Sequence, residues 1–143
     1  MRGSLPAVSL FSNCGAGDLG YARAGFSFEV LAELDARRLE VAGLNLPGAG
    51  LVDGDLRDTW PKVVREYHSR RGQEPPALLA ACPPCQGMST ARGGRGSEED
   101  ADAGSRDHRN LLVEVIAEVA RELAPRVIVV GNVPAFFRRS VRH

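Results

Sequence analysis

Five short apolar segments recur along the chain and are expected to be β-strands. They cover residues 7–11, 26–34, 50–52, 77–81 and 127–130. The first ends in a glycine-rich turn, and acidic residues follow the second and third. The fourth is apolar throughout, which is typical of a central strand in a parallel sheet that is covered on both faces.

Three amphipathic segments between these strands predict helices. Asp35 can cap a helix that runs to about Asn45, where Pro47 stops it. Asp58 or Thr59 can cap a second helix with Pro61 in its first turn, and its buried stripe is Trp60, Val63, Val64 and Tyr67. The third helix ends before Pro125, and its apolar side is Leu111, Leu112, Val115, Ile116, Val119 and Leu123.

Strands that alternate with helices predict an α/β fold with a parallel, doubly wound sheet, in one domain over residues 1–143. Residues 86–106 show no periodicity and hold five glycines, which is typical of a functional loop or a disordered segment. Only nine residues follow Pro134. We therefore expect a sheet truncated after about five strands, with its last edge unfinished or completed by another polypeptide.

Composition narrows the class of protein. A chain of 143 residues with 25% charged and 43% apolar residues suits a globular domain. Eighteen basic residues balance eighteen acidic ones, so bulk charge does not attract nucleic acid, and such contacts must be local or supplied by another part. The sequence has no apolar run of membrane length, no apolar leader and three cysteines, which predicts a cytoplasmic protein without membrane contact.

Residues 15–20 match the pattern G-x-G-x-x-G directly after the first strand. Such a turn lets a ligand approach the backbone, although it can also serve only to pack a strand against a helix. Glu33 and Asp35 lie at the end of the second strand, where an acid can hold ribose hydroxyls, and Asp55 closes the third strand at the same edge. This arrangement predicts a site for an adenosine-containing ligand; the alternative is a structural turn with surface acids.

Cys85 follows two prolines directly after the fourth strand. The prolines stiffen the loop and hold the cysteine at the crevice mouth, as a nucleophile requires. A small buried cysteine is the alternative. Cys82 and Cys85 also form a C-x-x-C pair, but the glycine-rich segment that follows does not predict the helix of a thioredoxin-like dithiol. No metal site is predicted, because a structural zinc site needs four ligands at suitable spacing.

Four segments together resemble the DNA cytosine-5 methyltransferase family. Residues 10–20 (LFSNCGAGDLG) and 24–26 (AGF) are similar to its first motif, and residues 83–89 (PPCQGMS) to its nucleophile motif. Residues 107–112 (DHRNLL) resemble the segment that opens its next helix, and residues 132–134 (NVP) match the end of its Glu-Asn-Val motif. The segments occur in the family's order and spacing and cover nearly the whole chain.

The resemblance implies a Rossmann-like methyltransferase fold with S-adenosyl-L-methionine as cofactor. Phe11 and the glycine turn with Gly15 and Gly17 would lie against the cofactor. Glu33 would hold its ribose, and Asp55 with Leu56 would contact its adenine. The substrate-binding residues would be Pro84, Gln86, Ser89 and Asn132.

The implied reaction is methylation of cytosine C5 in double-stranded DNA, as in restriction–modification systems. The target cytosine would be flipped out of the duplex, because its ring carbons cannot be reached inside the stack. The Cys85 thiolate would add to C6 and make C5 nucleophilic enough to take the methyl group. Removal of the C5 proton would then release Cys85. Residues 86–106 match the position of the lid that closes over the base.

Two departures from the family pattern affect this interpretation. Gly131 stands where the family has the glutamate that protonates or hydrogen-bonds cytosine N3, and loss of a general acid costs about 10²–10⁴ in rate. Asn13 stands where the family often has glycine. In addition, the 143 residues contain no Gln-x-Arg-x-Arg motif, target-recognition region or final family motifs.

These departures leave several functions open. The chain is expected to be a fragment, a decayed gene product, or one half of a split methyltransferase that binds DNA with a complementing subunit. A non-catalytic S-adenosylmethionine-binding partner subunit is an alternative that Gly131 favours. A dinucleotide-binding oxidoreductase domain would explain the glycine turn but not the PPCQ segment.

Overall fold

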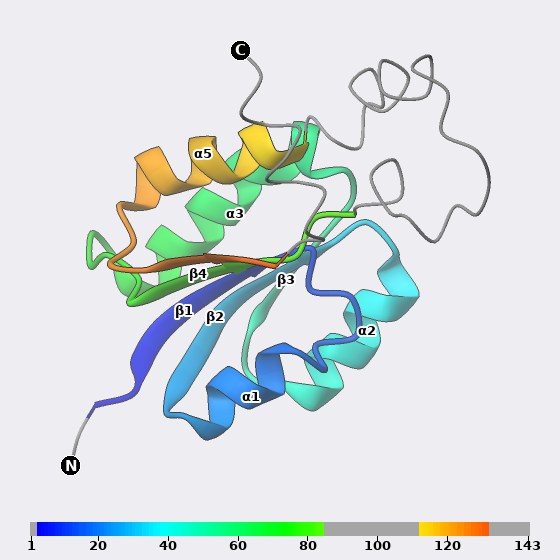
Figure 1. Cartoon of the computed structure of the whole chain (residues 1–143), viewed down its shortest axis with the longest axis horizontal. Helices are drawn as coiled ribbons and strands as arrows, with labels where there is room; N and C mark the ends of the chain where they lie inside the picture. Colours follow the sequence, from blue (N-terminus) through cyan, green and yellow to red (C-terminus); the bar gives the residue numbers. More distant parts are fainter. Residues whose placement is uncertain (1–2, 85–111, 132–143) are drawn as a thin grey trace, which may run out of the picture.

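In a computed structural model of the chain, which describes residues 3–84 and 112–131, five strands form one parallel sheet (Figure 1). The elements in chain order are β1 (Leu5–Leu10), α1 (Asp18–Arg23), β2 (Phe26–Glu33), α2 (Ala36–Asn45), β3 (Gly50–Asp53), α3 (Leu56–Arg71), β4 (Leu78–Ala81), α5 (Leu112–Leu123) and β5 (Ile128–Val130). The strand order is β3-β2-β1-β4-β5. The predicted parallel, doubly wound α/β sheet is therefore confirmed.

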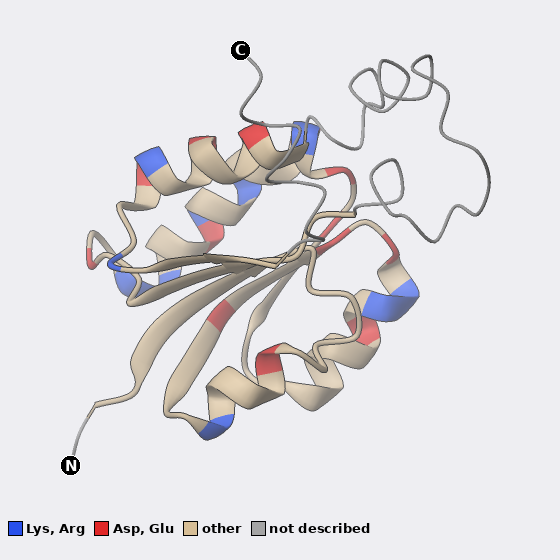
Figure 2. Ribbon diagram, viewed as in Figure 1, with Lys and Arg blue, Asp and Glu red and all other residues tan. Residues whose placement is uncertain are grey.

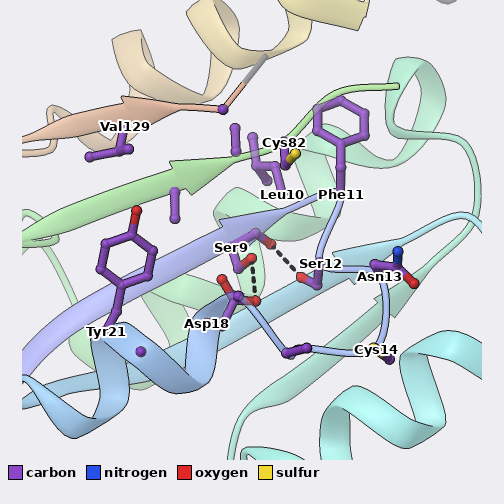
Figure 3. Close-up of a pocket in the computed structure, with 16 residues that line it drawn as sticks. Ser9, Leu10, Phe11, Ser12, Asn13, Cys14, Asp18, Tyr21, Cys82 and Val129 are labelled. Carbon is purple, nitrogen blue, oxygen red and sulfur yellow. Dashed lines mark hydrogen bonds between the residues drawn. The ribbon is translucent and has the colours of Figure 1, made fainter. Parts of the chain in front are cut away.

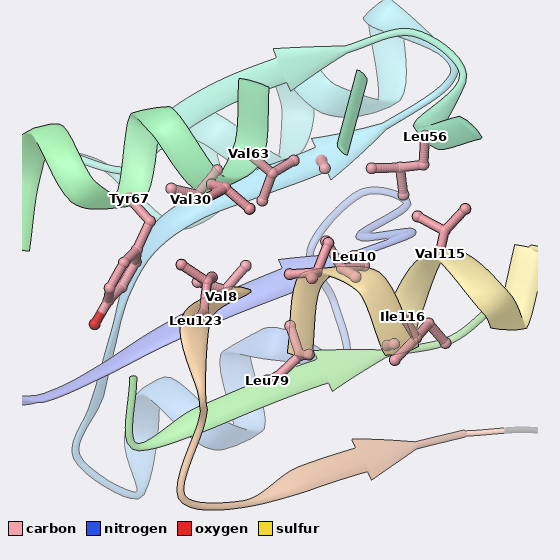
Figure 4. Packing of buried hydrophobic residues seen from close by; sticks show 14 of the residues in the cluster. Val8, Leu10, Val30, Leu56, Val63, Tyr67, Leu79, Val115, Ile116 and Leu123 are labelled. Atoms are coloured by element: carbon pink, nitrogen blue, oxygen red, sulfur yellow. The ribbon is translucent and has the colours of Figure 1, made fainter. Parts of the chain in front are cut away.

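Helices cover both faces of the sheet: α1 and α2 lie on one face, and α3 and α5 on the other (Figure 1). The larger apolar core fills the space between the sheet and α3 with α5 (Figure 4). Its members include Val8, Leu10, Val30, Leu79, Val63, Tyr67, Val115, Ile116, Val119 and Leu123. A smaller core under α1 and α2 contains Ala7, Phe28, Leu31, Leu39, Ala42, Leu46, Leu78 and Ala80. The central strands β1 and β4 are almost wholly buried, which explains why both of their faces are largely apolar, whereas the edge strands β3 and β5 keep exposed positions.

The helix predictions are confirmed in their faces and partly in their ends. Asp35 caps α2 as expected, since its side chain accepts hydrogen bonds from the backbone N–H groups of Arg37 and Arg38. The α3 stripe is confirmed for Val63, Val64 and Tyr67, which are buried, whereas Trp60 is partly buried against the same core. Within the described residues, no helix is long and apolar enough to cross a membrane.

The start of α3 is not where the sequence indicates. The cap is Asp55, not Asp58 or Thr59, and Pro61 is the sixth residue of the helix rather than a first-turn residue. The Asp55 carboxylate accepts from the Arg57 N–H at 2.9 Å, and the Thr59 hydroxyl donates to the Asp55 carbonyl at 2.9 Å. Thr59 thus closes the first turn from within the helix.

The chain reverses its direction of travel across the sheet between β3 and β4. From β1 the sheet grows through β2 and β3 to one edge, and the chain then crosses back to place β4 on the other side of β1. In open α/β sheets, ligands bind at the carboxyl ends of the strands where the order reverses. The topology therefore predicts a ligand site at the carboxyl ends of β1, β2, β3 and β4.

Candidate functional site

The loop after β1 has an unusual backbone. Phe11 and Asn13 adopt left-handed conformations, with φ angles of 57° and 53°. This region is rare for a bulky residue and is found mainly at turns or functional sites, where the surrounding structure must hold it. Here the Ser12 N–H donates to the carbonyl of Ala32 in β2 at 3.0 Å and fixes the loop against the neighbouring strand.

Glu33, at the carboxyl end of β2, is held by two backbone donors. Its carboxylate accepts from the Asn13 N–H at 2.9 Å and from the Asp35 N–H at 3.1 Å, and the residue is only 8% exposed. A carboxylate offers about four lone-pair positions. Glu33 is thus fixed in place and retains capacity to accept hydrogen bonds from ribose hydroxyls.

Asp55, at the end of the β3–α3 turn, has two local roles. It caps α3 and forms an ion pair with Arg57, with 2.6 Å between Oδ2 and Nη2. Hydrogen bonding to Arg57 lowers the pKa of the Asp55 carboxyl, so the group is ionised at neutral pH. A ligand contact at Asp55 would compete with Arg57 for the same oxygens.

Leu56 can serve a ligand only through its backbone. Its side chain is 3% exposed and belongs to the larger core. As the first residue of α3, its N–H has no partner within the helix. Leu56 thus supplies a backbone donor beside the Asp55 carboxylate.

One cavity of about 390 Å³ brings these groups together at the carboxyl edge of the sheet. Its lining includes five of the residues that the sequence identifies: Phe11, Glu33, Asp55, Leu56 and Pro84. These residues lie at the carboxyl ends of β1, β2, β3 and β4 or directly after them. Of the three acids that the sequence places at these strand ends, Glu33 and Asp55 face this common space and Asp35 does not. Figure 2 shows acidic residues in the segment between β2 and α2, at this edge of the sheet.

A second cavity of about 630 Å³ adjoins the first, since Phe11, Asn13 and Cys82 line both (Figure 3). The two predicted glycines differ in their relation to it. Gly17 lines the second cavity, and a Cβ there would meet nothing within 4 Å, so the space over its backbone is open. Gly15 lines neither cavity: it has a φ of +76°, and a Cβ there would approach Ala42 Cα at 3.2 Å. Gly15 permits close packing of the loop against α2.

The second cavity also contains a residue that the sequence interpretation does not include. Asp18, at the start of α1, is 7% exposed and accepts a hydrogen bond from the Ser9 hydroxyl at 2.7 Å (Figure 3). Burial raises the pKa of the Asp18 carboxyl to about 6, and the Ser9 hydrogen bond only partly offsets this. The one feature of the sequence that could have pointed to Asp18 is its position as an acidic residue inside the G-x-G-x-x-G turn.

Gly131 lies beside Cys82 at the ends of β5 and β4. Its N–H donates to the Ala81 carbonyl at 2.8 Å, and a Cβ at this position would lie 3.4 Å from Cys82 Sγ. That separation is an ordinary van der Waals contact, so a Cβ atom can be accommodated at residue 131.

The remaining predicted site residues are Cys85, Gln86, Ser89 and Asn132, and these lie outside the described residues, as does the segment 86–106. Pro84, which precedes the predicted nucleophile in the sequence, lines the 390 Å³ cavity. Among the described residues, no group of three or more His, Cys, Asp or Glu side chains is placed to hold a metal ion.

A parallel sheet of order β3-β2-β1-β4-β5, with two acids around a cavity at its carboxyl edge, defines a Rossmann-like α/β class. Within that class, the family model for C-5 cytosine-specific DNA methylases matches residues 5–142. The chain therefore belongs to the C-5 cytosine-specific DNA methylase family.

Individual relatives agree with this assignment. The chain is 31% identical over 134 residues to the type II methyltransferase M1.HgaI of Avibacterium volantium, covering 94% of this chain and 36% of the relative. It is 32% identical over 133 residues to M.AquIA of Picosynechococcus sp., covering 93% and 50%. The chain thus spans about a third to a half of the length of these curated relatives.

Solved structures show the same fold. A prophage-encoded E. coli protein described as a DNA modification methyltransferase superposes with a TM-score of 0.73 at 26% identity, covering 97% of this chain and 35% of that one. A short-chain dehydrogenase/reductase of Serratia marcescens superposes with a TM-score of 0.62 at 16% identity, covering 96% and 63%. The second likeness extends to the fold alone.

Proposed function

We propose that this chain is the cofactor-binding and nucleophile-bearing part of an enzyme that methylates C5 of cytosine in DNA. The observation that carries the proposal is the 390 Å³ cavity, where Phe11, Glu33, Asp55, Leu56 and Pro84 meet. Membership of the C-5 cytosine-specific DNA methylase family supports the same reaction.

The described residues fit S-adenosylmethionine. Glu33 offers a fixed carboxylate for ribose hydroxyls, and Asp55 with the Leu56 N–H offers an acceptor and a donor for the adenine edge. The open space over Gly17 in the adjoining cavity leaves room for the rest of the molecule. When bound, S-adenosylmethionine supplies an electrophilic methyl group.

Cys85 is the nucleophile in this proposal. Its thiolate would form a bond to cytosine C6, and the electron pair of the C5–C6 double bond would form the new bond from C5 to the methyl carbon. The bond between that carbon and the cofactor sulfur would break, and S-adenosylhomocysteine would leave with the electron pair. A base then removes the C5 proton, the double bond re-forms and the C6–S bond breaks, which restores the thiolate. The reaction needs a flipped base, because C6 is shielded inside the duplex.

A trapping experiment tests this assignment. DNA containing 5-fluorocytosine cannot lose a proton from C5, so the enzyme should remain covalently attached to it. The chain is incubated with S-adenosylmethionine, this DNA and a segment that carries the remaining family motifs. An adduct is expected with the wild-type chain and with Cys82→Ser. Cys82 is the control position because its thiol is exposed and lines both cavities. Loss of the adduct in Cys82→Ser but not in Cys85→Ser would refute the assignment.

Gly131 favours one second candidate function, a subunit that binds S-adenosylmethionine without catalysing transfer. Such a subunit would bind the cofactor through the same residues but form no adduct in any combination. The trapping experiment separates the two candidates when it is combined with a binding measurement.

A further inference from the structure

Asp18 has an unusual environment for a carboxylate. Its side chain lies on the wall of the 630 Å³ cavity, and its one hydrogen-bond partner within the described part of the chain is the neutral Ser9 hydroxyl (Figure 3). In the same part of the chain, no ion pair is formed with Asp18. A buried carboxylate without a positive partner is costly, because a hydroxyl does not replace the water that the charge has lost.

The fold does not require this charge. Asparagine has nearly the same shape, and its amide oxygen can accept the same hydrogen bond from Ser9 without the cost of burying an ion. Asp18 is also not needed to start α1 in the way that Asp35 and Asp55 start α2 and α3, since the N-cap of α1 is Gly17 and no side-chain cap is formed. Strained or costly groups of this kind are concentrated at ligand sites.

The position of Asp18 relative to the first cavity indicates which ligand group it could meet. The two cavities share Phe11, Asn13 and Cys82, with Glu33 and Asp55 on one side and Asp18 on the other. In a ligand whose adenosine lies at Glu33 and Asp55, the substituent on the 5′ carbon of the ribose is the part that can extend past Phe11 into the 630 Å³ cavity. In S-adenosylmethionine and its demethylated product, that substituent carries an amino acid group.

We propose that Asp18 binds the ammonium group of this amino acid part and so selects ligands that carry it. The proposal rests on the proposed function, because it takes the adenosine site as given. The carboxylate supplies the negative charge, the ammonium supplies the missing positive partner, and the Ser9 hydroxyl fixes the carboxylate that receives it. A charge-assisted hydrogen bond in a site shielded from water is stronger than a neutral one.

Calorimetric titration of the full chain tests the proposal with three probes: S-adenosylhomocysteine, the same molecule without its amino group, and 5′-methylthioadenosine. Asp18→Asn should weaken S-adenosylhomocysteine by about tenfold to a hundredfold. The same substitution should change the affinities for the other two probes by less than about twofold, since neither has an ammonium group. Ser9→Ala is the matched control, and it should weaken S-adenosylhomocysteine by less than Asp18→Asn.

The other outcomes overturn the proposal in distinguishable ways. Equal weakening of all three probes by Asp18→Asn would mean that Asp18 shapes the loop and contacts no ammonium. Wild-type affinity that is the same with and without the amino group would exclude an ammonium site while leaving the adenosine site intact. Failure of the wild-type chain to bind any of the three would overturn the proposed function together with this inference.

Discussion

Asp18 connects stability and binding at the scale of a single residue. Its pKa of about 6 lies above the ordinary value of 3.8, so the folded chain holds a proton at pH values where the unfolded chain has lost it. Stability therefore decreases as the pH rises from about 4 to 6 and stays lower above that range. A shift of this size corresponds to an upper limit of about 3 kcal/mol.

Asp18→Asn should accordingly stabilise the chain at neutral pH, by about 1–2 kcal/mol. The gain should shrink toward pH 4, where Asp18 is protonated in the wild type. Urea denaturation at pH 4.5 and 7.5 measures the difference. If Asp18→Asn were less stable than the wild type at pH 7.5, the claim that the buried Asp18 charge destabilises the folded chain would be wrong.

Gly131 is the second residue at which a substitution is informative. Because a Cβ there makes only an ordinary contact with Cys82 Sγ, Gly131→Glu should change the free energy of unfolding by less than about 1 kcal/mol. With a segment carrying the remaining motifs, it should raise methylation at least about tenfold over wild type, since a general acid contributes about 10²–10⁴. Tritium transfer from labelled S-adenosylmethionine to DNA measures this. Activity without such a gain would mean that another group occupies the place of the glutamate.

At the scale of elements, α2 and α3 begin in the same way and differ in what surrounds the cap. The Asp35 side chain accepts hydrogen bonds from two backbone N–H groups of the first turn of α2, and the Asp55 side chain accepts one in the first turn of α3. Asp55 lines the 390 Å³ cavity, whereas Asp35 is absent from its lining. The two helices therefore provide a matched pair in which the structural role is shared and the proposed ligand role is not.

Asp35→Ala and Asp55→Ala should each destabilise the chain by about 1 kcal/mol through loss of the cap. Only Asp55→Ala should also weaken S-adenosylhomocysteine in calorimetric titration. Because its lowered pKa lies below the value in the unfolded chain, the Asp55 contribution to stability is present at neutral pH and is lost as the pH falls through the acidic range. Equal affinities in the two variants would remove Asp55 from the ligand site.

The element patterns could be predicted where one physical rule dominates. Asp35 followed by an amphipathic segment specifies α2, and the apolar spacing of Val115, Ile116 and Val119 specifies the buried face of α5. The start of α3 could not be predicted, because three polar residues compete for the cap and Pro61 suggests a later first turn. Local propensity does not decide among them; the position of β3 and the hydrogen bonds of Asp55 do.

At the scale of the whole molecule, the order of the strands brings residues that are distant in the sequence together in one site. Glu33 and Asp55 could be predicted as neighbours, because parallel strands end at a common edge. Asp18 could not, because its importance depends on burial and on the cavity that β1, α1 and β4 form together, which no local pattern encodes. The role of Gly15 could not be predicted from the sequence either. Only the close approach of Ala42 in α2 shows that Gly15 serves packing and not ligand contact.

The 143-residue chain by itself should not methylate DNA at a measurable rate. Its net charge is zero, so nothing general attracts phosphates, and Gly131 offers no acid to activate the cytosine ring. These deficits affect binding and chemistry separately, so Gly131→Glu alone should remain inactive in the tritium assay. Robust turnover by the unmodified chain would refute both parts of this reasoning.

The central claim is that the carboxyl edge of this sheet is an S-adenosylmethionine site, and the most direct test compares ligands on the unmodified chain. Calorimetric titration with S-adenosylhomocysteine and with NAD presents the same adenosine with different substituents. The arrangement of Glu33, Asp55 and Asp18 predicts saturable binding of S-adenosylhomocysteine and weaker or undetectable binding of NAD. Tighter binding of NAD, or no binding of S-adenosylhomocysteine, would contradict the claim.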